Sequence, residues 1–177
     1  MLRRSALLVL LLGSIATAST AVQMDVPALT RAATDVVRVR VGSSRVAWTD
    51  DHRRLVTFVE VSVLETWKGA AADRLTLAQP GGERDGIGQH VSGVAPLTPG
   101  EEVVLFLEAQ GPLHRVVGLA QGVYRVERGD PASAARAVPA GLEGLELVPP
   151  KGAVPAPRQP VDLEVLRDEV RRTAGRR

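Results

Sequence analysis

The chain has 177 residues, is 45% hydrophobic and contains no cysteine. The absence of cysteine excludes disulfides, thiolate metal sites and thiol catalysis. The length suits one domain with processing segments. The formal net charge is +2, but Arg3 and Arg4 lie in an acid-free stretch of 18 residues, and the remaining chain carries 20 basic and 20 acidic residues. This balance and the five aromatic residues argue against a nucleic-acid partner.

Residues 1–18 have the pattern of a secretory signal peptide. Arg3 and Arg4 precede an apolar run of ten residues (6–15), and Ala16-Thr17-Ala18 supplies small residues for cleavage after Ala18. Cleavage after Ala21 is the alternative, which would leave Val22 first instead of Ser19. The apolar run is about half of the 20 residues that a membrane anchor needs. We therefore expect a periplasmic or secreted protein without a membrane span after cleavage.

Residues 19–34 are expected to lead into the domain with a short helix, for which Asp25 is the N-cap and Pro27 stands in the first turn. The next run, 36–48, alternates valine with arginine and predicts a strand. Gly42-Ser43-Ser44 interrupts this strand, which predicts a bulge or a sharp bend.

The segment 54–67 alternates valine with polar residues and predicts one long strand. A strand of this length has to curl, as strands do when a small sheet closes into a barrel. Further strands are expected at 74–79 and 102–108. The runs 115–120 and 123–128 are expected to form a hairpin. The sequence thus predicts a mainly β domain over 35–128, a small antiparallel OB-like barrel of five or six strands.

After residue 128 the strand pattern is expected to stop. Residues 129–160 are rich in Pro, Ala and Gly and predict a linker. Residues 161–177 predict a C-terminal helix capped by Asp162, with Leu163, Leu166 and Val170 on one face. Its arginines are expected to form a solvated helix end, with anion binding as the alternative.

Four runs resemble netrin-like domains and tissue inhibitors of metalloproteinases: Asp35–Val41, Thr57–Gly69, Leu75–Leu77 and Leu97–Leu107. The shared features are a first strand after "AD", a long strand ending in "KG" and a "GE" turn before an apolar strand. The resemblance implies the OB-fold barrel of that family. Inhibition through an N-terminal cysteine does not carry over, because the chain has none. The run Val116–Gly122 (VVGLAQG) also resembles bacterial exported proteins of unassigned role.

The glycine-rich segment 80–93 is the candidate binding loop, because glycines allow close approach of a partner and long loops often carry function. No lysine and no helix follow its glycines, as phosphate-binding loops would require. It could also be only a connection between strands. The residues proposed for binding are Gly81, Gly82, Arg84, Asp85, Gly86 and His90.

No catalytic constellation and no cofactor site is recognisable in the sequence. The three histidines, His52, His90 and His114, are far apart, and neither H-E-x-x-H nor H-x-H occurs, so no metal site is expected. The serines lack the G-x-S-x-G context of a nucleophile elbow. We expect a non-catalytic binding or structural module of the cell envelope, whose partner would be another envelope or secreted protein. The alternatives are a protease-inhibitor-like domain and a hydrolase with an unrecognised site.

Overall fold

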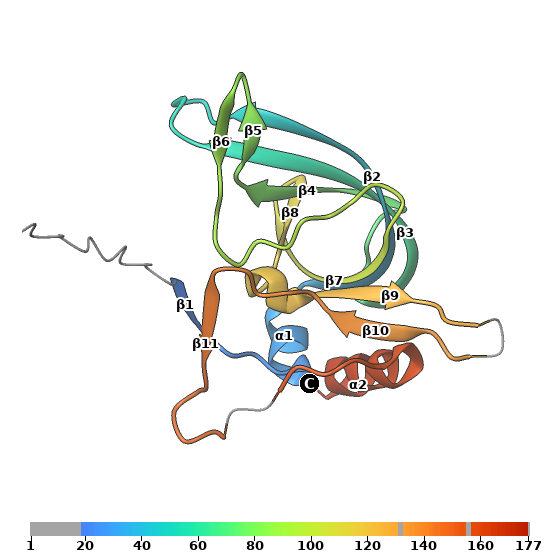
Figure 1. Ribbon diagram of the computed structural model, residues 1–177. Helices are drawn as coiled ribbons and strands as arrows, with labels where there is room; N and C mark the ends of the chain where they lie inside the picture. The colour runs from blue at the N-terminus through green and yellow to red at the C-terminus, as the bar shows by residue number, and fades with distance from the viewer. Residues whose placement is uncertain (1–18, 131–132, 155–156, 177) are drawn as a thin grey trace, which may run out of the picture.

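The computed structural model describes residues 19–130, 133–154 and 157–176 (Figure 1). The described chain is mainly β, with two α-helices and one short 3-10 helix. In chain order the elements are β1 (Ser19–Val22), α1 (Val26–Ala32), β2 (Asp35–Trp48), β3 (Leu55–Lys68), β4 (Arg74–Pro80), β5 (Gly82–Arg84), β6 (Ile87–Gln89), β7 (Glu102–Gln110), β8 (Leu113–Val116), η1 (Leu119–Gly122), β9 (Val123–Glu127), β10 (Arg136–Pro139), β11 (Leu145–Val148), β12 (Val161–Asp162) and α2 (Leu163–Gly175).

The two longest strands, β2 and β3, have 14 residues each and pair antiparallel. Their register shifts between Val41 and Ser44, where the sequence predicted a bulge. A side chain at Gly42 would bring its Cβ to 2.9 Å from the carbonyl oxygen of Glu60, so the bulge requires glycine at this position. Both strands curve strongly in Figure 1, as their length predicted.

The principal sheet has the strand order β12-β10-β9-β7-β2-β3-β4-β8, and β8 also pairs with β7. The hydrogen-bonded order therefore returns on itself through β7, β2, β3, β4 and β8, and the sheet curls around in Figure 1. The weakest point of this ring is the parallel contact of β4 with β8, which consists of the single pair Leu77–His114. The sheet is consequently almost closed, with an opening beside this pair.

The described residues form two apolar cores, one on each side of β7. Val103, Leu105 and Leu107 point into the curled sheet, where they pack with the valines of β2 and β3. Val104 and Phe106 face the opposite way, against the apolar side chains of α1 and α2. This two-sided burial explains why β7 is apolar at every position from Val103 to Leu107 rather than alternating.

Both predicted helices are present. Asp25 is the N-cap of α1, and its Oδ1 accepts a hydrogen bond from Ala28 N at 2.7 Å. The predicted face of α2, comprising Leu163, Leu166 and Val170, is buried. Asp162 occupies the N-cap position of α2, but its side chain makes no capping hydrogen bond. None of the helices in the described ranges is long and apolar enough to cross a membrane.

The predicted hairpin of 115–120 with 123–128 is wrong. β8 ends at Val116 and pairs with β7, whereas β9 pairs with β7 and β10. Gly118 and Leu119 both have left-handed backbone angles, with φ of 65° and 57°, which turn the chain into η1. The apolar residues of this run face both cores, Val117 one and Ala120 the other, so their clustering imitated a strand.

Gln121 of η1 holds the N-terminal segment. Its side chain is only 1% exposed, its Oε1 accepts from Met24 N at 2.8 Å, and its Nε2 donates to Val22 O at 3.1 Å. The amide thus satisfies the backbone groups of Val22 and Met24, while β11 pairs with β1 and accepts from Gln23 N through Val148 O. The VVGLAQG run therefore has a structural explanation in the described chain.

The sequence predicted that residues 129–160 contain no strands, and this prediction is wrong. β10 pairs antiparallel with β9, and β11 pairs in parallel with β1. Both strands have four residues, and each depends on a partner that is itself short or distant in sequence. Such non-local pairing leaves little trace in local hydrophobic periodicity, especially between prolines.

Candidate functional site

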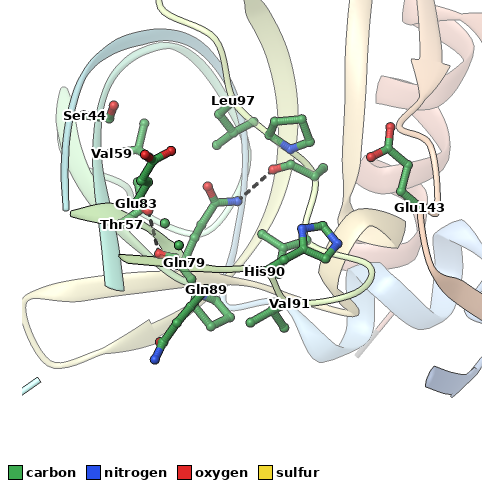
Figure 2. A pocket seen from close by; sticks show the side chains of 17 residues that line it. Ser44, Thr57, Val59, Gln79, Glu83, Gln89, His90, Val91, Leu97 and Glu143 are labelled. Atoms are coloured by element: carbon green, nitrogen blue, oxygen red, sulfur yellow. Dashed lines mark hydrogen bonds between the residues drawn. The ribbon is translucent and has the colours of Figure 1, made fainter. Parts of the chain in front are cut away.

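The segment 80–93, predicted as a loop without structure of its own, contains the β5–β6 hairpin. This hairpin forms one wall of a groove that has a volume of about 670 Å³. β3 and β4 form the adjacent wall, segment 90–97 runs along the other side, and Glu143 lies at the far rim (Figure 2).

The structure brings only part of the predicted loop set together. Gly81, Gly82 and His90 line the groove. The other three, Arg84, Asp85 and Gly86, lie at the tip of the hairpin. Arg84 donates through Nη1 to Val46 O at 2.7 Å, which ties the tip to β2 rather than presenting the guanidinium to a ligand.

The glycines serve the packing of the hairpin. A Cβ at Gly81 would lie 2.6 Å from Gln89 O, and a Cβ at Gly82 would lie 2.6 Å from the Oγ1 of Thr57. The hydroxyl of Thr57 donates to Gly81 O at 2.8 Å. Close approach is therefore the reason for glycine here, as predicted, but the approaching group is the protein's own backbone and side chains.

The inner end of the groove is polar and uncharged. Gln79 of β4 is 7% exposed, and its Nε2 donates to Ala95 O at 3.2 Å. A carbonyl oxygen can only accept, so this bond fixes which end of the amide is nitrogen and leaves Oε1 on the opposite side. No partner for Oε1 is found among the described residues. Figure 2 shows the amide of Gln79 within the groove.

The charged side chains of the groove lie at its rim. Glu83 and Glu143 are exposed, as is His90 between them in the view of Figure 2. Neither lysine nor arginine lines the groove within the described ranges. The groove therefore favours a neutral or positively charged ligand.

The described residues of the groove show no assembled catalytic centre. Thr57 donates its proton to a carbonyl oxygen, and no hydrogen bond joins a hydroxyl to His90. A nucleophile would need such a base within hydrogen-bond reach. Nowhere in the described part of the chain do three His, Asp or Glu side chains gather closely enough to hold a metal ion.

The other two histidines lie apart from the groove. His52 contacts Asp50 O in the turn between β2 and β3. His114 of β8 lies with its Nε2 3.9 Å from Asp35 Oδ2, and its Nδ1 is buried without a partner among the described residues.

Sequence reasoning missed Gln79, although the alternation of its strand contained the signal. Leu75 and Leu77 point into the core, and Gln79 is the next residue of the same phase. A polar residue at an inward position of a strand indicates either a buried hydrogen bond or a ligand contact.

Comparison of the chain with protein-family models, with curated proteins and with solved structures found no match. The groove must therefore be interpreted from its own geometry.

Proposed function

We propose that the chain is a non-catalytic binding module and that the groove beside β5–β6 is its ligand site. The observation that carries this proposal is the side chain of Gln79, which is 7% exposed at the inner end of the groove and whose acceptor oxygen has no partner among the described residues. This oxygen is open to the groove, so water can satisfy it, and a ligand with a hydrogen-bond donor can replace that water. A concave site with few, fixed polar groups is typical of ligand recognition.

The strand order supports an OB-like architecture for this module. Five strands, β7, β2, β3, β4 and β8, form the ring, and its opening beside the pair Leu77–His114 resembles the partly open five-stranded barrel of that fold. OB barrels bind ligands with strand faces and the loops next to them. The groove has this composition, because strands and connecting segments share its walls.

We further propose that the module is exported to the periplasm or secreted, with cleavage after Ala18, which lies outside the described residues. Cleavage there would leave all four residues of β1, whereas cleavage after Ala21 would leave only Val22 of the strand. We therefore expect the exported protein to begin at Ser19. N-terminal mass spectrometry checks this expectation, and a form that begins at Val22 or retains Met1 would contradict it.

Partner capture from the native envelope tests whether the groove is the site. The change is replacement of 82–88 by a two-residue Asn-Gly turn, which removes one wall of the groove but no core side chain. We expect this variant to fold and to lose a stoichiometric envelope or secreted partner that the unaltered protein retains. Fold is checked by the thermal midpoint and circular dichroism.

The control is the same Asn-Gly turn in place of the exposed pair Gly111 and Pro112, between β7 and β8 and outside the groove. Capture should survive in this control. Unchanged capture by the 82–88 variant would show that the groove is not the site. Turnover of a hydrolase substrate that depends on His90 would show instead that the module is an enzyme.

A further inference from the structure

A second, smaller cavity adjoins the groove. It has a volume of about 260 Å³ and lies at the opening of the sheet, where β4 and β8 diverge beyond their single residue pair. Its apolar lining comes from Pro80, Val94, Val116 and Leu119. Among the described residues that line it, Arg115 alone is charged, and it is paired with Glu108 at 2.6 Å.

The two cavities share one wall, formed by Gln79, Pro80, Val94 and Ala95. The hydrogen bond from Gln79 Nε2 to Ala95 O holds this wall together, and Ala120 N donates to Gly93 O at 2.7 Å on its other side. Pro80 is exposed, so the rim of the wall is open to solvent. One extended ligand can therefore reach both cavities across Pro80.

The chemistry of the three parts defines the ligand. The Oε1 of Gln79 can accept a hydrogen bond from a ligand, the smaller cavity suits an aliphatic group, and Glu83 with Glu143 favours a cation. No Phe, Tyr or Trp side chain lines the described groove or the smaller cavity, so the large stacking platform that base recognition typically uses is missing. A polypeptide in extended conformation supplies all three groups: a backbone N–H, an aliphatic side chain and a basic side chain.

We propose that the groove and the smaller cavity together bind an extended polypeptide segment in which an aliphatic residue is flanked by basic residues. This proposal rests on the proposed function and adds the chemical class of the ligand. A backbone N–H of the segment donates to Gln79 Oε1, the aliphatic side chain enters the smaller cavity, and a basic side chain lies between Glu83 and Glu143.

Three capped pentapeptides provide the probes: acetyl-AKLKA-amide, acetyl-AKAKA-amide and acetyl-AELEA-amide. Each is titrated into the protein at low salt, and binding is followed by the ¹H–¹⁵N signals of the Gln79 side chain and of segment 91–97. We expect the first peptide to bind at least tenfold more tightly than either of the others, because it alone offers both the aliphatic and the basic groups. Equal affinities, or signals that do not respond to the first peptide, would overturn the proposal.

Variants assign the contacts. Gln79→Met removes the acceptor at similar volume and should weaken the first peptide three- to tenfold, whereas Gln110→Met, at an exposed position of β7, should not. The double variant of Glu83→Gln and Glu143→Gln should remove the preference for the basic peptide over the acidic one. Its control is Glu127→Gln with Glu146→Gln, two exposed acids outside the groove. A preference that survives the groove variant would contradict the role of these carboxylates.

A photo-crosslinking residue at position 90 separates failure of this proposal from failure of the proposed function. An adduct at a polypeptide segment in which an aliphatic residue is flanked by basic residues supports both. An adduct at any other polypeptide segment leaves a binding module but overturns this ligand. An adduct with a glycan or a lipid leaves a binding module but overturns the polypeptide ligand. The absence of any adduct overturns both.

Discussion

Replacement of Gly69 by alanine is expected to lower the free energy of unfolding by about 3 kcal/mol. Gly69 follows β3 with a φ of 88°, where an L side chain costs about 1 kcal/mol. Its Cβ would also lie 2.1 Å from Asp35 Oδ1 and 2.8 Å from Thr34 O. Asp35 is 8% exposed and accepts a hydrogen bond from Ala70 N, so relief of the clash would break this bond at the start of β2.

The matched control is Gly100→Ala. Gly100 has a φ of 89°, but nothing lies within 4 Å of its would-be Cβ. Its cost should be about 1 kcal/mol, the backbone strain alone. Urea denaturation of both variants measures the difference. Equal losses would show that the close approach of Gly69 to Asp35 contributes nothing, which would contradict the packing described for the "KG" end of β3.

The second large effect concerns Glu102, a buried acid of β7. Its side chain is 6% exposed and contacts three guanidinium groups: Arg128 at 2.7 Å, Arg38 at 2.8 Å and Arg40 at 3.4 Å. Glu102→Gln keeps the volume but leaves these cations without their shared counter-ion. Breaking a buried pair costs about 3–5 kcal/mol. Because Arg40 and Arg128 are about half exposed, we expect a loss of about 2 kcal/mol at pH 7.

The same substitution predicts a pH dependence. The hydrogen bond from Arg128 is the largest cause that lowers the pKa of Glu102 below its usual 4.5, and burial opposes it. A lowered pKa means that the ionised group stabilises the fold fully above its usual pKa, and that this stabilisation is lost as the pH falls through the lowered value. The gap in unfolding free energy between the unaltered protein and Glu102→Gln should therefore be constant from pH 7 to about pH 6 and shrink below pH 4.

Urea denaturation between pH 3 and pH 7 measures this gap, with Glu127→Gln, an exposed acid of β9, as the control. The control should follow the unaltered protein at every pH. A gap that stays constant down to pH 3 would contradict the account of Glu102.

The sequence allowed the long strands and the helices to be predicted because their signals are local. The alternation of Val37, Val39 and Val41 indicates which face of β2 is buried, and in the structure these three side chains lie in the core. The bulge near Gly42 could also be predicted, because a glycine followed by two serines interrupts that alternation. Closure of the sheet, by contrast, depends on one pair between β4 and β8, which no local pattern encodes.

The short elements could not be predicted for the same reason. β1 and β11 pair with each other across more than a hundred residues. Leu119 adopts a left-handed conformation that is rare for a branched residue, and the amide of Gln121 bonds the backbone of Val22 and Met24, about a hundred residues away in sequence. Neither feature is visible in hydrophobic periodicity.

The candidate site was predicted in part. The glycine signal led to a segment that borders the groove, because Gly81, Gly82 and His90 line it. The same signal also predicted Arg84 as a binding residue, but its guanidinium donates a hydrogen bond to Val46 O. Gln79, on which the proposal depends, comes from the neighbouring strand β4. It lies in the groove because segment 90–97 folds back beside β4 and forms the opposite wall, a contact that no local pattern predicts.

Photo-crosslinking in the native envelope tests most directly whether the groove binds a ligand. Benzoylphenylalanine in place of His90 lies in the groove, and the same residue in place of Val165, which is 53% exposed on α2, provides the control. We expect one discrete adduct of one-to-one stoichiometry from position 90 and none of that mass from position 165. No adduct from position 90, or the same adduct from both positions, would contradict the assignment of the groove as the binding site.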